Sequence, residues 1–430
     1  MNKKKFVTIL VLALSLLAIL STLTGCFGST APAAGWAGVT VSGDSVYTVS
    51  SQGQLVALAL ADFTKEPNWT AAVEGIASSG GFLSCSAPSI AVAVYGTPVV
   101  SGDMIYVAGY NGKVYSYSIS KQSESSNALL DQDDSKPIVG GPAVGQGKVY
   151  VASSNGNLYA LDATTLAQIW KFPTGNKIWS TPAVDDGMIF VGSFDKKVYA
   201  VDAATGKQKW SFDSHGAVLA TPLIDDGTVY VASFDRHIYA LDEATGSLKW
   251  QFPAANQSGN EPREWFWATP VISNGILYAT CLDGNVYAVK TQDGSLVATF
   301  DLGAEVSSSP VVVDSKVIVA THDAKIYSLD ASGAKTQLLL VNLRDNDKDN
   351  NPSKLIVSSP LSAANGVVFI HGLQSDRIYA LDLVTKNPTP SEILTGVASS
   401  SSTITVPTTV VVTTIVTTTV TVTATVTVTK

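Results

Sequence analysis

A short pattern of residues recurs along the chain, and an internal repeat limits the possible folds more than any single motif does. Two adjacent copies show it clearly, one from Ser180-Thr181-Pro182 to Trp210 and the next from Ala220-Thr221-Pro222 to Trp250. A proline opens the copies at intervals of about 40 to 50 residues: Pro98, Pro142, Pro182, Pro222, Pro270, Pro310 and Pro360. An earlier copy has Val39 at the place of the proline, so we count eight units.

Each unit holds four short segments of alternating or wholly apolar residues, separated by residues typical of turns. In one unit they include residues 189–193 and 198–202. The segments are too short and too rich in β-branched residues for helices. Four strands in a repeat of this length indicate a propeller blade. The sequence therefore predicts an all-β fold, an eight-bladed β-propeller of four-stranded blades over residues 36–396.

The predicted turns have suitable residues. Between the second and third segments the chain has dipeptides that allow the positive φ of a tight hairpin: Asn111-Gly112, Asn155-Gly156 and Asp283-Gly284, with Asp195, Asp235 and Asp323 in the same register. Between the third and fourth segments, Asp202 precedes Thr205-Gly206, so the carboxylate can accept hydrogen bonds from the turn amides. We expect these aspartates to be turn formers.

Two further register positions concern packing. The residue two before each proline is small: Gly96, Gly140, Ser180, Ala220, Ala268, Ser308 and Ser358. Small residues fit a crowded axis at which the first strands of all blades converge. Trp170, Trp210 and Trp250 recur on the fourth strand, where a large ring can bury its area against the neighbouring blade.

Three units depart from the pattern. The first two carry long insertions, residues 63–94 and 118–137, and the second lacks the Asp, Thr-Gly and Trp signature. In the last unit, Asp382 is followed by Asn387-Pro388-Thr389-Pro390 in place of a regular turn. The sequence therefore leaves open how the ring closes.

The run from Ala200 to Gly206, with Trp210 after it, resembles the tryptophan-docking motif of quinoprotein-like (PQQ-repeat) propellers. The resemblance covers residues 36–396. That family includes the quinone-cofactor dehydrogenases and also the non-enzymatic propeller lipoprotein of the outer-membrane β-barrel assembly machine. The motif is specific for the fold and says little about function.

The N-terminus predicts export and a lipid anchor. Lys3 to Lys5 precede an apolar stretch from Phe6 to Leu23, which is the order of an export signal. Leu23-Thr24-Gly25-Cys26 resembles the bacterial lipobox, so residues 1–25 are expected to be a lipoprotein signal peptide and Cys26 the lipidated residue, followed by a linker over 26–35. The protein is then extracytoplasmic, anchored to a bacterial membrane. The alternative is an uncleaved transmembrane helix, because the apolar stretch has about the minimum spanning length.

The sequence favours a protein that is not an enzyme. The resemblance to the quinone-dependent dehydrogenases implies a calcium ion, a catalytic aspartate and often a disulfide between adjacent cysteines, and no adjacent cysteines occur. No cofactor is expected, and a PQQ site is not favoured. The four histidines, His215, His237, His322 and His371, fall at different registers and are expected on the surface or in loops. The net charge of −8, with no basic run beyond the signal, argues against nucleic acid as a partner.

One acidic segment has the spacing of a calcium loop. Asp345, Asp347 and Asp349 alternate as oxygen ligands, although Ile356 stands where a bidentate glutamate would close the loop. The segment is therefore predicted to be either a weak calcium site or a solvated acidic connection between two blades.

The predicted binding surface lies at the channel mouth, where connections between blades emerge. Aromatic residues gather there beside an arginine, which is the composition of an interface core: Trp179, Arg263, Trp265, Phe266 and Trp267. The alternative for some of them is packing within the fold. Residues 397–430 form a Thr/Val-rich tail of low complexity, either a strand or a hydroxyl-rich stalk.

Three functional hypotheses follow. The first is a non-catalytic, lipid-anchored envelope propeller, monomeric, that binds an envelope protein as a scaffold or recognition module. The second is a PQQ- and calcium-dependent dehydrogenase-like enzyme. The third is a surface adhesin or ligand sensor.

Overall fold

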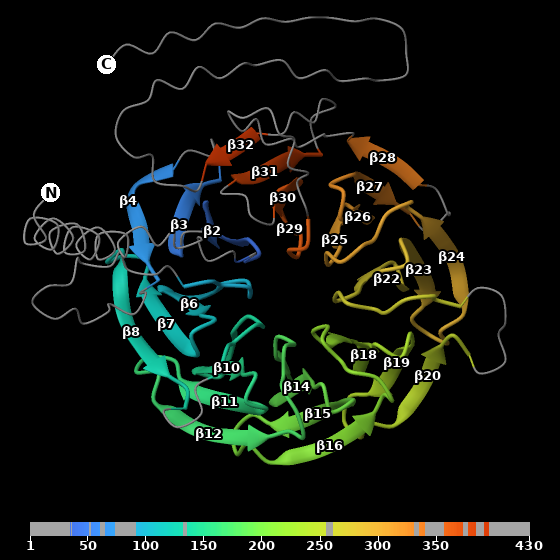
Figure 1. Cartoon of the computed structure of the whole chain (residues 1–430), viewed down its shortest axis with the longest axis horizontal. Coiled ribbons are helices and arrows are strands. Elements are labelled where there is room, and N and C mark those ends of the chain that lie inside the picture. Colours follow the sequence, from blue (N-terminus) through green and yellow to red (C-terminus); the bar gives the residue numbers. More distant parts are fainter. Residues whose placement is uncertain are drawn as a thin grey trace, which may run out of the picture.

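The fold is an eight-bladed β-propeller, and each blade is a four-stranded antiparallel sheet built from consecutive strands. The computed structural model describes residues 35, 37–50, 53–60, 65–73, 92–131, 136–254, 261–330, 335–339, 357–372, 377–383 and 391–394. Figure 1 shows the blades arranged in a ring, with the first strand of each blade innermost and the fourth outermost. The prediction of the fold is confirmed.

Blades 1 to 4 contain the strands β1 (Thr40–Ser42), β2 (Ser45–Val49), β3 (Gln54–Ala59), β4 (Lys65–Ala72), β5 (Val99–Ser101), β6 (Met104–Ala108), β7 (Lys113–Ser118), β8 (Ser123–Leu129), β9 (Ala143–Gly145), β10 (Lys148–Ala152), β11 (Asn157–Asp162), β12 (Gln168–Pro173), β13 (Ala183–Asp185), β14 (Met188–Gly192), β15 (Lys197–Asp202) and β16 (Gln208–Asp213). Blades 5 to 8 contain β17 (Leu223–Asp225), β18 (Thr228–Ala232), β19 (Ile238–Asp242), β20 (Leu248–Phe252), β21 (Val271–Ser273), β22 (Ile276–Thr280), β23 (Asn285–Lys290), β24 (Leu296–Asp301), β25 (Val311–Val313), β26 (Lys316–Ala320), β27 (Ile326–Leu329), β28 (Lys335–Leu339), β29 (Ser362–Ala364), β30 (Val367–His371), β31 (Arg377–Asp382) and β32 (Ser391–Leu394).

The hydrophobic core lies between the blades. The second and third strands are buried over most of their length, whereas a fourth strand such as β12 is mostly exposed, with Phe172 as its buried residue. Each core cluster joins two neighbouring blades, as where Phe190 and Val198 of blade 4 pack with Val229 and Leu241 of blade 5. The propeller is therefore held together by blade-to-blade burial of apolar area.

Tryptophans link the blades as predicted. The indole Nε1 of Trp210 donates a hydrogen bond of 2.8 Å to the carbonyl oxygen of Glu243 in blade 5, and its ring lies over Gly246. Trp170 and Trp250 repeat this arrangement one blade before and one blade after. Gly246 has a φ of +71°, and a Cβ at this position would lie 2.6 Å from the indole of Trp210. The glycine of the Thr-Gly turn thus allows the left-handed backbone of the turn and also leaves room for the indole ring.

The two long insertions, residues 63–94 and 118–137, contain the fourth strands of blades 1 and 2. In blade 1, β4 carries a docking tryptophan, Trp69, whose Nε1 donates to the carbonyl oxygen of Ile119 in blade 2 at 3.2 Å. In blade 2, the turn before β8 lacks the aspartate that accepts hydrogen bonds from the turn amides in other blades, because Ser118 stands at that place. There the carboxylate of Asp103 accepts hydrogen bonds from the amide and hydroxyl of Ser120, each at 2.8 Å.

The residues before the first strands form a crowded ring around the axis. A Cβ on Gly96 would lie 2.3 Å from the backbone nitrogen of Gly141, which confirms the need for small residues. Ser180 is fully buried, and its hydroxyl donates to the carbonyl oxygen of Gly192 at 2.9 Å. The next residue, Thr181, accepts a hydrogen bond of 2.8 Å from the amide of Gly141 in the preceding blade. Ser180 and Thr181 therefore tie blade 4 to itself and to the preceding blade, and the hydroxyls of Thr269 and Ser309 repeat the contact between neighbouring blades.

The register assigned to the last blade was wrong by one residue. Ser362 pairs with Phe369 as Ala183 pairs with Phe190 in blade 4, so Leu361 takes the place of the proline. The small residue at the axis is therefore Ser359, which is fully buried and donates to the carbonyl oxygen of His371 at 2.6 Å, and not Ser358.

The ring closes by direct contact between blades 8 and 1 (Figure 1). Phe369 of blade 8 packs in the same cluster as Val39 and Val46 of blade 1. The Nδ1 of His371 hydrogen-bonds the carbonyl oxygen of Ala37 at 2.7 Å, and Ser362 donates to the carbonyl oxygen of Val39. His371 is 1% exposed, so the expectation of a surface or loop residue was wrong for this histidine.

Candidate functional site

One residue from each of seven blades lines the mouth of the central channel. Each of these residues directly precedes the small residue that its blade places beside the propeller axis. Together they surround a cavity of about 120 Å³: Tyr95, Val139, Trp179, Leu219, Trp267, Ser307 and Ser358. The residue before each of them is buried in the core of its blade, as Ile178, Val218 and Phe266 show. The backbone of each interblade connection thus turns one side chain to the channel and the preceding one into the core.

Loops between second and third strands add aromatic rings beside this mouth. The ring of Trp179 meets that of Phe194 edge-on, with 4.8 Å between centroids. Phe234 stacks on Trp265 at 4.9 Å and also contacts Trp267 at 5.7 Å. Trp265 remains 46% exposed. We define the aromatic mouth as Trp179, Phe194, Phe234, Trp265 and Trp267.

A cation lies on one side of the aromatic mouth. The Nζ of Lys177 lies 4.4 Å from the ring centroid of Trp179 and 4.2 Å from that of Phe194. The Nε1 of Trp179 donates to the hydroxyl of Ser154 in the preceding blade at 3.1 Å. Cation–π contacts and this hydrogen bond hold Trp179 in one orientation.

Of the five residues predicted to bind a partner, the structure brings four to the surface near the mouth. Trp179 and Trp267 are half-buried and line the channel, Trp265 is exposed, and Arg263 is exposed with its amide bonded to a carboxylate oxygen of Asp283 at 3.0 Å. Phe266 is fully buried and packs against Tyr287 between blades 5 and 6, so it belongs to the core. The sequence did contain a signal that Phe266 is a core residue. The residues at the same register in other units, such as Ile178 and Val218, are also apolar, and they too are buried.

The loops between second and third strands, two of which carry Phe194 and Phe234, are held by pairs of tyrosine and aspartate or asparagine. The hydroxyl of Tyr199 donates to Asp195 at 2.7 Å, and Tyr287 donates to Asp283 at 2.8 Å. Asn155 donates to the hydroxyl of Tyr159 at 2.7 Å. Burial and the bond to Asp195 raise the pKa of Tyr199, so the hydroxyl stays protonated and remains a donor. These carboxylates do more than form turns, because they anchor each loop to the strand beneath it.

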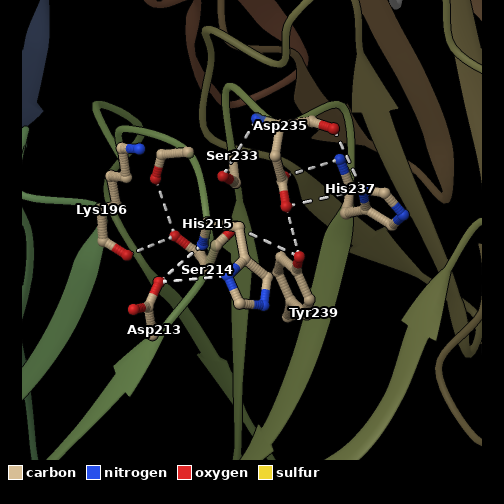
Figure 2. Close-up of polar contacts among 9 residues, drawn as sticks. Lys196, Asp213, Ser214, His215, Ser233, Asp235, His237 and Tyr239 are labelled. Atoms are coloured by element: carbon tan, nitrogen blue, oxygen red, sulfur yellow. Dashed lines mark hydrogen bonds and ion pairs between the residues drawn. The ribbon is translucent and has the colours of Figure 1, made fainter.

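Figure 2 shows the corresponding network between blades 4 and 5. The carbonyl oxygen of Lys196 accepts hydrogen bonds from the amide and hydroxyl of Ser214, while Tyr239 donates to Asp235 and to the carbonyl oxygen of Ser214. His237 lies 3.5 Å from the carboxylate of Asp235, and the hydrogen bond to Asp235 raises the pKa of His237. The network joins the two loops on either side of the interblade connection.

Other predicted residues lie outside the part that the structure describes. These are Cys26, the acidic residues Asp345, Asp347 and Asp349, and the tail over 397–430. Within the described residues, no group of three or more histidine, cysteine or acidic side chains is placed to hold a metal ion. No helix among those same residues is long and apolar enough to cross a membrane.

The fold and the docked tryptophans define the class of protein, a propeller of the quinoprotein type. The sequence defines the family. The PQQ_2 family model, described as outer membrane protein assembly factor BamB, matches residues 84–165, 120–216 and 182–387. The chain belongs to this family, and the overlapping matches reflect its repeats.

Solved structures share the fold. BamB from Moraxella catarrhalis is similar with a TM-score of 0.59 and 16% identity, over 78% of this chain and 90% of that chain. The computationally designed protein Ika8 is similar with a TM-score of 0.60 and 14% identity, over 80% of this chain and 95% of that one. At these identities the likeness shows the fold alone. Among curated proteins, none matches this chain.

Proposed function

We propose that this protein is a non-catalytic, lipid-anchored envelope propeller that binds a partner protein through the aromatic mouth. The observation that carries the proposal is the exposed ring of Trp265, stacked on Phe234 and followed by Trp267 at the channel. A few residues supply most of the binding energy of a protein interface, and tryptophan is enriched among them. The family description, an outer membrane protein assembly factor, agrees with a role in binding other proteins.

The support beneath the aromatic mouth favours binding. Tyrosine–aspartate pairs tie down the loops of blades 4 to 6, and Phe234 holds Trp265 at 4.9 Å. A surface that is ordered before contact loses less conformational entropy when a partner binds. The proposed interface is therefore a rigid patch on one end of the propeller.

The proposal predicts that the double variant Trp265→Ala, Trp267→Ala loses its partner. Truncation of an interface hot spot costs about 2 kcal/mol or more, equivalent to a roughly thirtyfold weaker complex. We would purify the tagged protein from native membranes after mild cross-linking and quantify stoichiometric partners. Leu248→Ala is the matched control, because Leu248 is 47% exposed on β20, away from the mouth. Identical partner recovery from all three proteins would contradict the proposed site.

The anchoring part of the proposal depends on Cys26. In Cys26→Ser, lipidation and signal cleavage at that site should be lost, so labelled palmitate should no longer be incorporated. Metabolic labelling and immunoblotting measure this directly. Labelled palmitate in the variant at the level of the parent would show that Cys26 does not carry the lipid.

A further inference from the structure

Three cations surround the outer side of the aromatic mouth. Arg236 and Arg263 line a groove of about 590 Å³ between blades 5 and 6, together with Glu261, Asn285 and Tyr287. Lys196 stands on the equivalent loop of blade 4. All three cations are exposed, and they come from three separate connections.

Two of these cations occupy backbone positions at which sibling blades have glycine. The fourth residue of the loop between second and third strands has a left-handed φ in every described case. It is Gly53, Gly112, Gly156 or Gly284 in four blades, with φ between +66° and +87°, and Ala324 at +62° in blade 7. In blades 4 and 5 it is Lys196 at +73° and Arg236 at +72°. An L side chain in this region carries a steric cost that glycine avoids. Blade 7 bears the same cost with the uncharged Ala324. Blades 4 and 5, beside Trp179 and Trp265, are the two that place a long cationic side chain at this position.

The acidic groups nearby are already engaged. Asp195 accepts the hydroxyl of Tyr199, Asp235 accepts the hydroxyl of Tyr239 and pairs with His237, and Asp283 accepts Tyr287 and the amide of Arg263. Within the part of the chain that the structure describes, no ion pair includes Lys196, Arg236 or Arg263. Further carboxylates at this end of the blades are Glu261 in the groove, Asp213 beside His215, and the exposed Glu264, Asp301 and Glu305.

The turns at the opposite end of blades 4 and 5 are acidic. The turns between first and second strands carry Asp185, Asp186, Asp225 and Asp226, and three of these aspartates line a second cavity. In a chain of net charge −8, three exposed cations without an ion pair among the described residues therefore stand beside the aromatic mouth. Exposed cations of this kind attract a negatively charged partner during encounter.

We propose that Lys196, Arg236 and Arg263 bind the carboxylates of an acidic polypeptide segment in the partner. This rests on the proposed function and specifies the chemistry of its partner. Guanidinium groups match carboxylates in bidentate geometry. An extended segment with several carboxylates reaches three separate loops in succession, whereas one small anion reaches those of a single groove. Glu261 also repels a doubly charged phosphate more strongly than a single carboxylate.

The test uses a fluorescent peptide that alternates glutamate with leucine, and the same peptide with glutamine for glutamate. Binding to the full chain is followed by anisotropy at several salt concentrations. The triple variant Lys196→Gly, Arg236→Gly, Arg263→Ala should bind the glutamate peptide at least about tenfold more weakly. Affinity of the parent should fall as salt rises.

Ala324→Gly is the matched control, because Ala324 occupies the same loop position in blade 7 with φ +62° and carries no charge. It should bind like the parent. Since glycine relieves the backbone at 196 and 236, the urea midpoint of the triple variant should not fall, which separates lost binding from lost folding.

Absence of binding, equal binding of the glutamine peptide, or unchanged binding by the triple variant would overturn the inference. So would displacement of the peptide by inorganic phosphate or by vesicles of anionic phospholipid at matched ionic strength. If the native partner depends on Trp265 and Trp267 but is retained by the triple variant, the inference fails while the proposed function stands.

Discussion

Trp210→Ala is expected to lower the free energy of unfolding by about 3–5 kcal/mol, the range for removal of a large buried ring. The side chain of Trp210 is 8% exposed and packs against Phe190 at 5.7 Å. Its Nε1 bonds the carbonyl oxygen of Glu243, and its ring covers Gly246, so both contacts with blade 5 vanish together. The substitution therefore removes a hydrogen bond and a ring contact from the same blade boundary.

Urea unfolding followed by circular dichroism measures this loss. Trp265→Ala is the control, since the same residue type is removed from a site that is 46% exposed. We expect the midpoint to fall strongly for Trp210→Ala and by little for Trp265→Ala. Because repeat proteins can unfold in parts, the comparison rests on the midpoints and on the slopes of the transitions. Equal midpoints would contradict the role of the tryptophans in joining the blades.

Gly246→Ala is the second substitution with a large expected effect, about 2–4 kcal/mol, from left-handed strain plus overpacking. Its φ is +71°, and the added Cβ would meet the indole of Trp210 at 2.6 Å. A rigid ring on one side and a tight turn on the other leave little room for relaxation.

Gly227→Ala separates the two causes of this loss. Gly227 has a φ of +64°, but a Cβ there meets nothing within 4 Å. Its replacement should therefore cost only the backbone strain, about 1–2 kcal/mol. Urea midpoints of the two variants, measured side by side, give the contribution of the ring contact. If Gly227→Ala is as damaging as Gly246→Ala, the close approach of Trp210 is not what requires glycine.

The repeat predicted most of the fold because each unit carries the same turn residues, small ring residues and strand pattern. Prediction was weaker where the pattern breaks. Trp69 was missed because its strand lies in an insertion, and its docking depends on contact with Ile119 of the next blade. The proline of the last unit misled the register, because strand pairing places Leu361 there. His371 was misplaced because its partner, the carbonyl of Ala37, lies at the other end of the chain.

The candidate site was predicted in outline only. The aromatic composition of the segment before blade 6 pointed to a binding surface. Which of its rings can contact a partner depends on the backbone, which turns successive side chains alternately into the core and to the channel. Phe266 points into the core, while Trp267 faces the channel. Phe194 and Phe234 were not singled out, because their role comes from stacking across loops that are distant in sequence. The cations at Lys196 and Arg236 became informative only once their backbone angles were compared with those of sibling blades.

Site-specific photo-cross-linking in living cells tests most directly whether the aromatic mouth binds a partner protein. A photoreactive phenylalanine derivative would replace Trp265, and in a second strain it would replace Leu248, which is equally exposed on β20. The account predicts one defined cross-linked protein from position 265 and none from position 248. No product from position 265, or the same products from both positions, would contradict it.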